Sequence, residues 1–192
     1  MNGFGPGRVL GSVVYPAAEV EAPGVVRHIA RNRFSLGEPS GERSTRTIAL
    51  SGALTAAGLS APVRPRLRDE VWVKLWGNLS FNPISALTHA TPDVLCTDPG
   101  TRGVARAMML KAQAIAEALG ASFAIDVERR IDCGTAVGAH RTSMLQDLEA
   151  VRPMEIEALI GSVQEVGRLT GLPTPTIDTV LALIRLRARI AP

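Results

Sequence analysis

The sequence predicts a mainly α chain in which a small α/β segment over residues 1–66 precedes a helical domain over residues 67–192. Strand-like runs are confined to the first segment, whereas from Leu67 onward the apolar residues recur with helical spacing. The 192 residues, with a hydrophobic content of 46%, are enough to bury a substantial core. A long helix expected over Arg68–Thr88 opens the second part, and the rest of the chain is organised around it.

Three strand-like runs are predicted in the first segment, at Gly11–Tyr15, Gly24–Ala30 and Arg33–Gly37. The link Arg31-Asn32 suits a tight turn, so we expect the second and third runs to pair as a hairpin. Helical periodicity follows over Ser44–Ala57, with Gly58 placed to end the helix, and Pro62–Pro65 suits a short edge strand. A segment this small is typical of the closing part of a larger sheet rather than of an independent domain.

The helices expected in the second part are joined by short loops into one bundle. Pro83 lies inside the first helix and should kink or break it, because proline has no N–H to donate. Turns containing proline, at Thr91–Asp93 and Asp98–Gly100, should form the next connection. The helices are predicted over Arg68–Thr88, Val104–Leu119, Asp126–Ala139, Ser143–Ala150, Met154–Thr170 and Thr174–Ile190.

Composition and charge argue against several functional classes. The net charge of +3 comes from arginines spread along the chain, and aromatic residues make up only 4%, so we expect no nucleic-acid surface. The two cysteines, Cys96 and Cys133, and the three histidines lack metal-ligand spacing, so we expect no metal site. No apolar run reaches the roughly 20 residues of a membrane span, and the N-terminus lacks the character of a signal peptide. We therefore expect a cytoplasmic protein that does not bind membranes.

The stretch Asp69–His89, DEVWVKLWGNLSFNPISALTH, carries the most informative polar residues. Lys74, Asn78 and Asn82 lie four residues apart and therefore share one helix face, so that an amine and two carboxamides converge near Pro83. Lysine occurs at only two positions in the chain, and unlike arginine it can release a proton near neutral pH. The pattern indicates proton chemistry, and the alternative is a solvated polar stripe on an amphipathic helix.

A second informative stretch is His140–Gly161, HRTSMLQDLEAVRPMEIEALIG. Ser143 begins a capping-box pattern in which Gln146 would reach back to the start of the helix. Glu155 follows a proline in the first turn of a predicted helix, where an acid complements the helix dipole. Taken alone, these residues have ordinary structural explanations.

The order and spacing of these motifs resemble the ketopantoate reductase family. Lys74-Leu-Trp-Gly-Asn78-Leu-Ser-Phe-Asn82-Pro-Ile-Ser-Ala is similar to the K-L-x-x-N-x-x-x-N-P-x-[ST]-A signature of that family. The segments that begin at Ser143 and Glu155 resemble its S-M-L-Q-D and E-I-[DE]-x-x-x-G motifs, in the same order. The runs NGFG near the N-terminus and GLPTP near the C-terminus match two further motifs, so the resemblance covers essentially the whole chain.

The resemblance implies both a fold and an activity. Residues 67–192 would form a helical substrate domain similar to the C-terminal domain of 6-phosphogluconate dehydrogenase. Residues 1–66 would be the closing α/β elements of a Rossmann dinucleotide-binding domain. The implied reaction is the NADPH-dependent reduction of 2-dehydropantoate, or of a related branched 2-keto acid, in pantothenate biosynthesis. The resemblance leaves a homodimer open.

The resemblance also assigns roles to residues. Lys74 would be the general acid that protonates the ketone oxygen as NADPH delivers hydride. Asn78 and Asn82 would form hydrogen bonds to the substrate, Ser143 would bind its carboxylate, and Glu155 would help to hold the substrate and tune the site. A small keto acid must touch several of these groups at once, so we expect them to meet around one cleft although they are far apart in sequence.

The sequence departs from the family in one large respect. Family members begin with a Rossmann domain that carries G-x-G-x-x-G, whereas here the glycine-rich start, MNGFGPGRVLG, has no strand before it. Asn2 would lie beside the cofactor at the domain junction, with most of the NADP-binding domain absent. We therefore expect a fragment or a truncated gene product that is inactive alone. The alternative is a non-catalytic helical module, derived from the family, for dimerisation or interaction.

Overall fold

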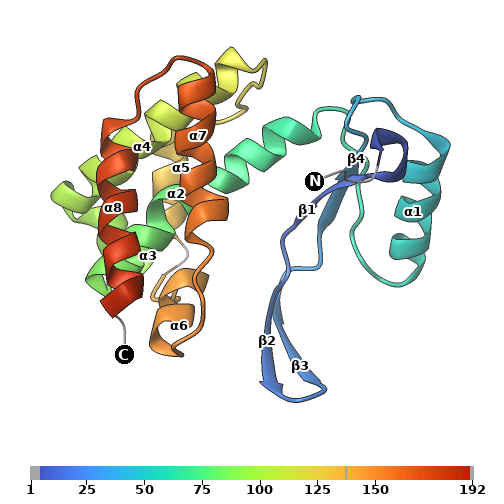
Figure 1. The fold of residues 1–192 in the computed structure, drawn as a ribbon. Helices are drawn as coiled ribbons and strands as arrows, with labels where there is room; N and C mark the ends of the chain where they lie inside the picture. The colour runs from blue at the N-terminus through green and yellow to red at the C-terminus, as the bar shows by residue number, and fades with distance from the viewer. Residues whose placement is uncertain (1–4, 137, 191–192) are drawn as a thin grey trace. The chain divides into compact units, whose positions relative to one another are not determined.

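The computed structural model describes residues 5–136 and 138–190, and the chain is mainly helical, as predicted (Figure 1). It forms two compact units, Met1–Val71 and Trp72–Pro192. The boundary between them falls inside helix α2 (Leu67–Thr88), which begins in the first unit and continues into the second. Within the two described ranges, no helix is long and apolar enough to cross a membrane.

The first unit contains two short antiparallel strand pairs, one nested inside the other. A 3₁₀ turn (η1, Pro6–Arg8) leads into β1 (Gly11–Val14), which pairs with β4 (Phe34–Gly37). Between them in sequence, β2 (Ala17–Ala22) pairs with β3 (Val25–Ala30), and this hairpin extends away from the first pair (Figure 1). The predicted hairpin between the second and third strand-like runs is therefore wrong, because each run pairs with a partner earlier in the chain.

The turn residues explain this difference. The chain reverses at Pro23-Gly24, where Gly24 has a φ of 79°. Proline followed by a glycine with positive φ is the combination that a type II turn uses. The expected turn, Arg31-Asn32, instead links β3 to β4, and Arg31 has a φ of 60°. The Pro-Gly pair is thus the sequence signal that identifies the true turn.

Helix α1 (Thr45–Ala56) begins and ends as its sequence predicts. The Ser44 side chain caps it by accepting a hydrogen bond from the Thr47 backbone N–H at 3.2 Å, and a glycine with positive φ follows its last turn. Arg46 donates from Nε to Oε1 of the buried Glu38 carboxylate at 2.7 Å, and Ser44 bonds to the same oxygen. These hydrogen bonds, chiefly the one from Arg46, lower the pKa of Glu38 to about 2.

The connection from α1 to α2 stays close to β4. An isolated parallel bridge joins Leu36 to Val63, so the segment Pro62–Pro65 contributes bridging contacts instead of the predicted edge strand. In the first turn of α2, Glu70 accepts a hydrogen bond from the Tyr15 hydroxyl at 3.3 Å and pairs with Arg64 at 2.8 Å. These contacts explain why the start of α2 belongs to the first unit.

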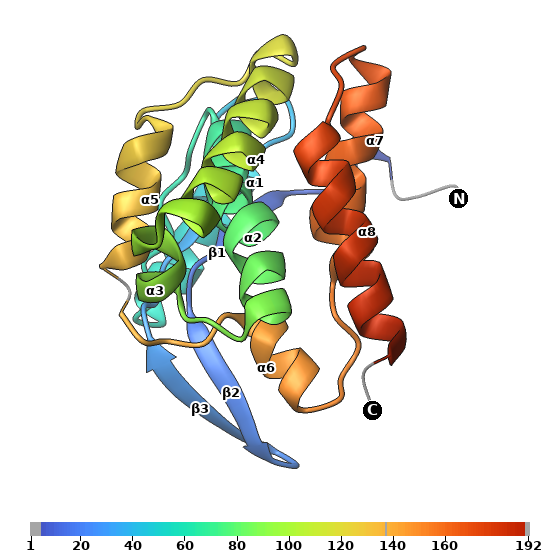
Figure 2. The same cartoon turned by 90° about the vertical axis from the view of Figure 1, so that its left-hand side faces the viewer.

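The second unit is a helical bundle around one contiguous apolar core. After α2 come α3 (Pro92–Thr97), α4 (Pro99–Ala118), α5 (Val127–Thr135), α6 (Ser143–Glu149), a π-helical turn (η2, Glu157–Gly161), α7 (Ser162–Leu169) and α8 (Pro175–Ile190). Figure 2 shows α7 and α8 running side by side, and α4 contacts both of them as well as α5. Trp76 of α2 is fully buried and stacks on Phe123, with ring centroids 4.1 Å apart.

Several details of the second unit differ from the sequence prediction, among them α4, which begins at Pro99 instead of Val104, and α5, which ends at Thr135 instead of Ala139. Helix α2 continues through Pro83 to Thr88, so the proline does not break it. The expected connection after α2 contains a short helix, α3, which begins with proline in its first turn, as helices often do. The helix expected over Met154–Thr170 begins only at Ile156, and it passes through the π-helical turn before it becomes α7.

Candidate active site

Helix α2 presents a polar face beside its buried apolar flank. Trp76 and Leu79 are 0% exposed and fix the rotation of the helix against the core. The spacing of four residues then places Lys74, Asn78 and Asn82 in one row along the helix. Lys74 and Asn78 are partly buried, and Asn82 is 7% exposed, so this face is not an ordinary solvated stripe.

Helix α6 brings the Ser143 hydroxyl to this row. Asn82 Nδ2 lies 3.4 Å from Ser143 Oγ and donates to it, although the two residues are 61 positions apart in sequence. Ser143 itself is exposed, so its hydroxyl is open to a ligand as well as to Asn82.

The capping role expected for Ser143 is wrong. The buried Thr142 caps α6 instead, accepting a hydrogen bond from the Leu145 backbone N–H at 3.3 Å. Gln146 donates to the Arg141 carbonyl at 3.0 Å, outside the capping-box pattern. Because Thr142 holds the cap position, the Ser143 hydroxyl is directed elsewhere. Thr142 was missed because Thr and Ser are both good caps and adjacent in sequence, and the non-helical backbone of Thr142 (φ −65°, ψ 155°) is what decides between them.

Glu155 acts electrostatically on Lys74. Burial lowers the pKa of the Lys74 ammonium below its ordinary value, and the Glu155 carboxylate opposes this shift by favouring the charged form. Glu155 is exposed and lies just before the helical stretch that begins at Ile156, rather than in a first helical turn. The structure thus places the Asn82 carboxamide within hydrogen-bond distance of the Ser143 hydroxyl, and the Glu155 carboxylate within electrostatic range of the Lys74 amine.

The link between α6 and Glu155 has an unusual backbone. Val151 has a φ of 53°, in the left-handed region that β-branched residues rarely adopt. It ends α6 in a Schellman arrangement, in which the Arg152 N–H donates to the Asp147 carbonyl at 2.8 Å. The side chains of Arg152 and Asp147 also pair at 2.9 Å, so the exit from α6 is fixed twice.

An arginine that sequence reasoning did not single out lies against α2. The Arg130 guanidinium approaches Gly77 so closely that a Cβ there would require the arginine side chain to shift. The same guanidinium lies over the ring of Phe81, with Cζ 5.4 Å from the centroid. Gly77 stands directly before Asn78. A glycine inside this helical run was the available sequence signal that another group approaches α2 closely at this point.

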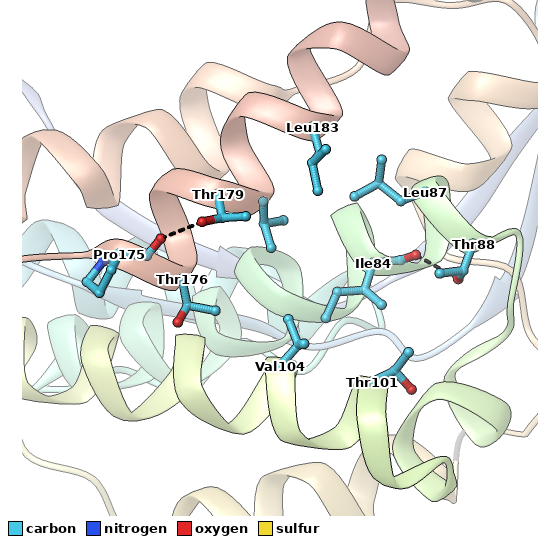
Figure 3. A pocket seen from close by; sticks show the side chains of 10 residues that line it. Ile84, Leu87, Thr88, Thr101, Val104, Pro175, Thr176, Thr179 and Leu183 are labelled. Atoms are coloured by element: carbon cyan, nitrogen blue, oxygen red, sulfur yellow. Dashed lines mark hydrogen bonds between the residues drawn. The ribbon is translucent and has the colours of Figure 1, made fainter.

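A separate pocket of about 500 Å³ lies between α2, α4 and α8 (Figure 3). Its walls are mostly apolar, and they include Ile84, Val104 and Leu183. The hydroxyls of Thr88 and Thr179 donate to backbone carbonyls of their own helices at 2.7 and 2.9 Å, as the dashed lines in Figure 3 mark. None of the described residues that line this pocket is titratable, and none of them belongs to the row of Lys74, Asn78 and Asn82 on α2.

Two of the sequence predictions concern cofactor and metal binding. Asn2, the residue predicted to lie beside the cofactor, falls outside the described residues. Among residues 5–136 and 138–190, no group of three or more His, Cys, Asp or Glu side chains could hold a metal ion.

These features define a class of protein, a helical domain with a candidate polar site. Its central helix carries an amine and two carboxamides on the face where residues from the later helices lie. The chain belongs to the ketopantoate reductase family, since the model of the ketopantoate reductase PanE/ApbA C-terminal domain matches residues 66–188. The match includes the whole polar row of α2 together with Ser143 and Glu155.

Individual relatives agree with this assignment. The chain is 64% identical over 182 residues to the 2-dehydropantoate 2-reductase of Mesorhizobium japonicum, covering 95% of this chain and 56% of the relative. A protein of known structure from Ralstonia solanacearum MolK2 is 40% identical, with a TM-score of 0.91, covering 96% of this chain and 56% of that one. For the 2-dehydropantoate 2-reductase from Methylococcus capsulatus, the identity is 32%, the TM-score 0.84 and the coverage 92% and 62%. The chain therefore spans little more than half the length of these relatives.

Proposed function

We propose that this chain is the substrate-binding and proton-donating part of an NADPH-dependent 2-dehydropantoate 2-reductase that acts in the cytoplasm. The observation that carries this proposal is the hydrogen bond between Asn82 and Ser143, with the electrostatic influence of Glu155 on Lys74 beside it, within a chain of this family. The relatives named above as 2-dehydropantoate 2-reductases support the substrate, a small branched 2-keto acid.

Lys74 is proposed as the general acid. Addition of hydride to a ketone builds negative charge on the carbonyl oxygen, and a positioned ammonium can neutralise that charge by donating its proton from Nζ. Burial lowers the pKa of Lys74, which makes the proton easier to give, while Glu155 keeps the side chain charged until the reaction begins. The opposing influences suit a group that must hold a proton and then release it.

The neutral donors are proposed to hold the substrate. Asn78 and Asn82 carry carboxamide N–H groups on the same face of α2 as Lys74, and such groups can bond to the ketone oxygen and the carboxylate. The exposed hydroxyl of Ser143, already next to Asn82, is the proposed partner of the substrate carboxylate. This arrangement would orient the ketone carbon toward the incoming hydride.

The hydride donor must be held largely by chain that is absent from this sequence. We propose that residues 1–66 close the dinucleotide-binding domain and that Asn2 lies beside the NADPH. The nested strand pairs of the first unit suit such a closing role, because two-stranded pairs of this kind are only marginally stable by themselves.

The test is to restore the absent part. We would join this chain to the N-terminal segment of the Mesorhizobium japonicum relative that it does not cover, and follow NADPH oxidation with 2-dehydropantoate and with unbranched 2-keto acids. The expected result is turnover with a preference for the branched substrate, with the complete relative as the positive control. A chimera that folds and binds NADPH but reduces none of these acids would contradict the proposal and favour a non-catalytic module.

A further inference from the structure

The residues that follow Glu155 form a π-helical turn, η2 (Glu157–Gly161). Its wide hydrogen bond runs from the Ser162 N–H to the Glu157 carbonyl. Such turns are rare and usually occur as single wide turns inside α-helices, frequently at functional sites. Glu155 lies two residues before this turn, so the direction of its side chain depends on how the turn is held.

A two-pronged ion pair holds the turn to α8. Arg185 donates from Nε to Oε1 of Glu157 at 2.7 Å and from its terminal nitrogen to Oε2 at 2.6 Å. This bidentate geometry fixes the carboxylate in orientation as well as in distance. Glu157 is two residues from Glu155, so the orientation of one carboxylate constrains the backbone that carries the other.

Gly161 completes this arrangement. A Cβ placed there would meet Oε2 of Glu157, so any larger residue would require the Glu157 side chain to shift. Glu157 and Gly161 are the second acid and the glycine of the Glu-Ile-Glu-x-x-x-Gly run, and neither has a catalytic role in the proposed reaction. Their contact gives a physical reason for both residues.

Glu155 and the ion pair share one surface. A hollow of about 450 Å³ is lined by Glu155, Glu157 and Arg185, together with neighbouring residues of η2 and α8. The side chains of Glu157 and Arg185 are 65% and 45% exposed, and ion pairs so exposed add little to folding stability. Stability is therefore a poor explanation for so exact a bidentate contact beside the candidate site.

We propose that the Glu157–Arg185 pair and Gly161 are positioning elements that hold the Glu155 carboxylate toward Lys74. This inference rests on the proposed function, since it assigns these residues a role in setting the proton donor of that reaction.

The titration of Lys74 tests this proposal in the chain as it is. Lysine occurs only at Lys74 and Lys111, so NMR of chains labelled at the lysine side chain gives two resonances, and Lys111→Arg assigns them. Glu155→Gln sets the reference: it should lower the pKa of Lys74, because the carboxylate that favours the ammonium is gone.

Two variants separate positioning from direct charge effects. Arg185→Gln removes a positive charge, so electrostatics alone would raise the pKa of Lys74, whereas loss of positioning should lower it. Gly161→Ala changes no charge and should displace the Glu157 carboxylate, lowering the pKa of Lys74 by at least half of the change that Glu155→Gln causes. Arg187→Gln, on the same helix, is the matched control and should not lower it. Circular dichroism melting confirms that each variant folds.

Each outcome bears on the proposal. If Glu155→Gln lowers the pKa of Lys74 while Arg185→Gln and Gly161→Ala leave it unchanged or raise it, the positioning role is wrong and the pairing within the candidate site stands. If Glu155→Gln has no effect, there is no carboxylate influence to position, and both this inference and the proposed part of Glu155 in the site fail. The reductase activity itself is decided separately by the chimera.

Discussion

The two units of this chain bury their apolar side chains in very different ways. The second unit has a continuous core to which every helix from α2 to α8 contributes. In the first unit, the buried apolar residues among those described are Val13, Leu36, Ala61 and Leu67. Its β2–β3 hairpin leaves Val20 73% exposed and Val26 66% exposed.

This contrast indicates which unit can hold the side chains of the candidate site in place with its own core. The side chains of the candidate site project from the unit whose helices are locked by their own core. The first unit relies more on polar contacts, above all the Glu38–Arg46 pair. A hairpin with so little buried surface is marginal by itself, which agrees with a unit that is completed by further chain.

The largest effect expected is on catalysis in the second unit. In the chimera with the Mesorhizobium japonicum segment, Lys74→Ala should lower kcat roughly 10²–10⁴-fold, the usual range for loss of a general acid. Lys111→Ala is the control and should leave kcat near that of the parent, since Lys111 belongs to α4 and is not one of the residues of the polar row. Near-normal turnover in Lys74→Ala would remove the proton-donor role.

Next in size is the difference in core packing between the units. Ile115, which is fully buried in α4, should cost about 2–5 kcal/mol of unfolding free energy when changed to alanine. Ile29→Ala, on the exposed β3 strand, should change it by no more than about 0.5 kcal/mol. Urea unfolding of both variants measures the contrast, and equal losses would show that the hairpin is packed more tightly than its exposure indicates.

The first unit should respond to acid through Glu38. Its pKa is lowered from 4.5 to about 2, so the stabilisation from this carboxylate is present above pH 4.5 and is lost as the pH falls toward 2. Glu38→Gln should weaken the first unit at neutral pH and reduce its further loss of stability in that acidic range. Hydrogen exchange of α1 across this range would detect the change. Glu42→Gln, in the same segment and exposed, is the control, and identical behaviour of the two variants would contradict the assignment.

The smallest effect concerns which residue caps α6. Thr142→Val should cost about 1 kcal/mol, the usual value for a lost N-cap, whereas Ser143→Ala should change stability much less. In the chimera the order should reverse for substrate binding, with Ser143→Ala raising KM more. Thermal melts and steady-state kinetics of the two variants measure both quantities. A larger loss of stability in Ser143→Ala than in Thr142→Val would show that Ser143, and not Thr142, caps α6.

Much of this arrangement could be predicted from sequence because it is local. Periodicity located the long helices, and the spacing of four residues placed Lys74, Asn78 and Asn82 on one face. The failures arose where a choice depends on distant contacts or on the residue at which a helix begins. The β2–β3 pairing was missed although Pro23-Gly24 signals its turn, and Thr142 could not be preferred over Ser143 without knowing where the helical backbone of α6 begins.

Other features had no local signal at all. The pair between Glu157 and Arg185 joins residues 28 positions apart, and neither charge pattern nor periodicity predicts it. Helical periodicity does not distinguish a π-helical turn from an α-helical one over so few residues, so η2 was read as ordinary helix. The electrostatic influence of Glu155 on Lys74 likewise emerges only when the helices pack together.

The π-helical turn sets which changes of length this segment tolerates. A π turn holds one residue more than an α turn, so deleting one residue within η2 would restore ordinary helical geometry. The wider turn already accommodates the extra residue, so the segments on either side would keep nearly their present orientation about the helix axis. A deletion within α7 has no wide turn to absorb it and would rotate everything before it by about 100° relative to the residues that follow. Glu155 would then point in another direction with its own identity unchanged, so a change of length in α7 alters the site more than one in η2.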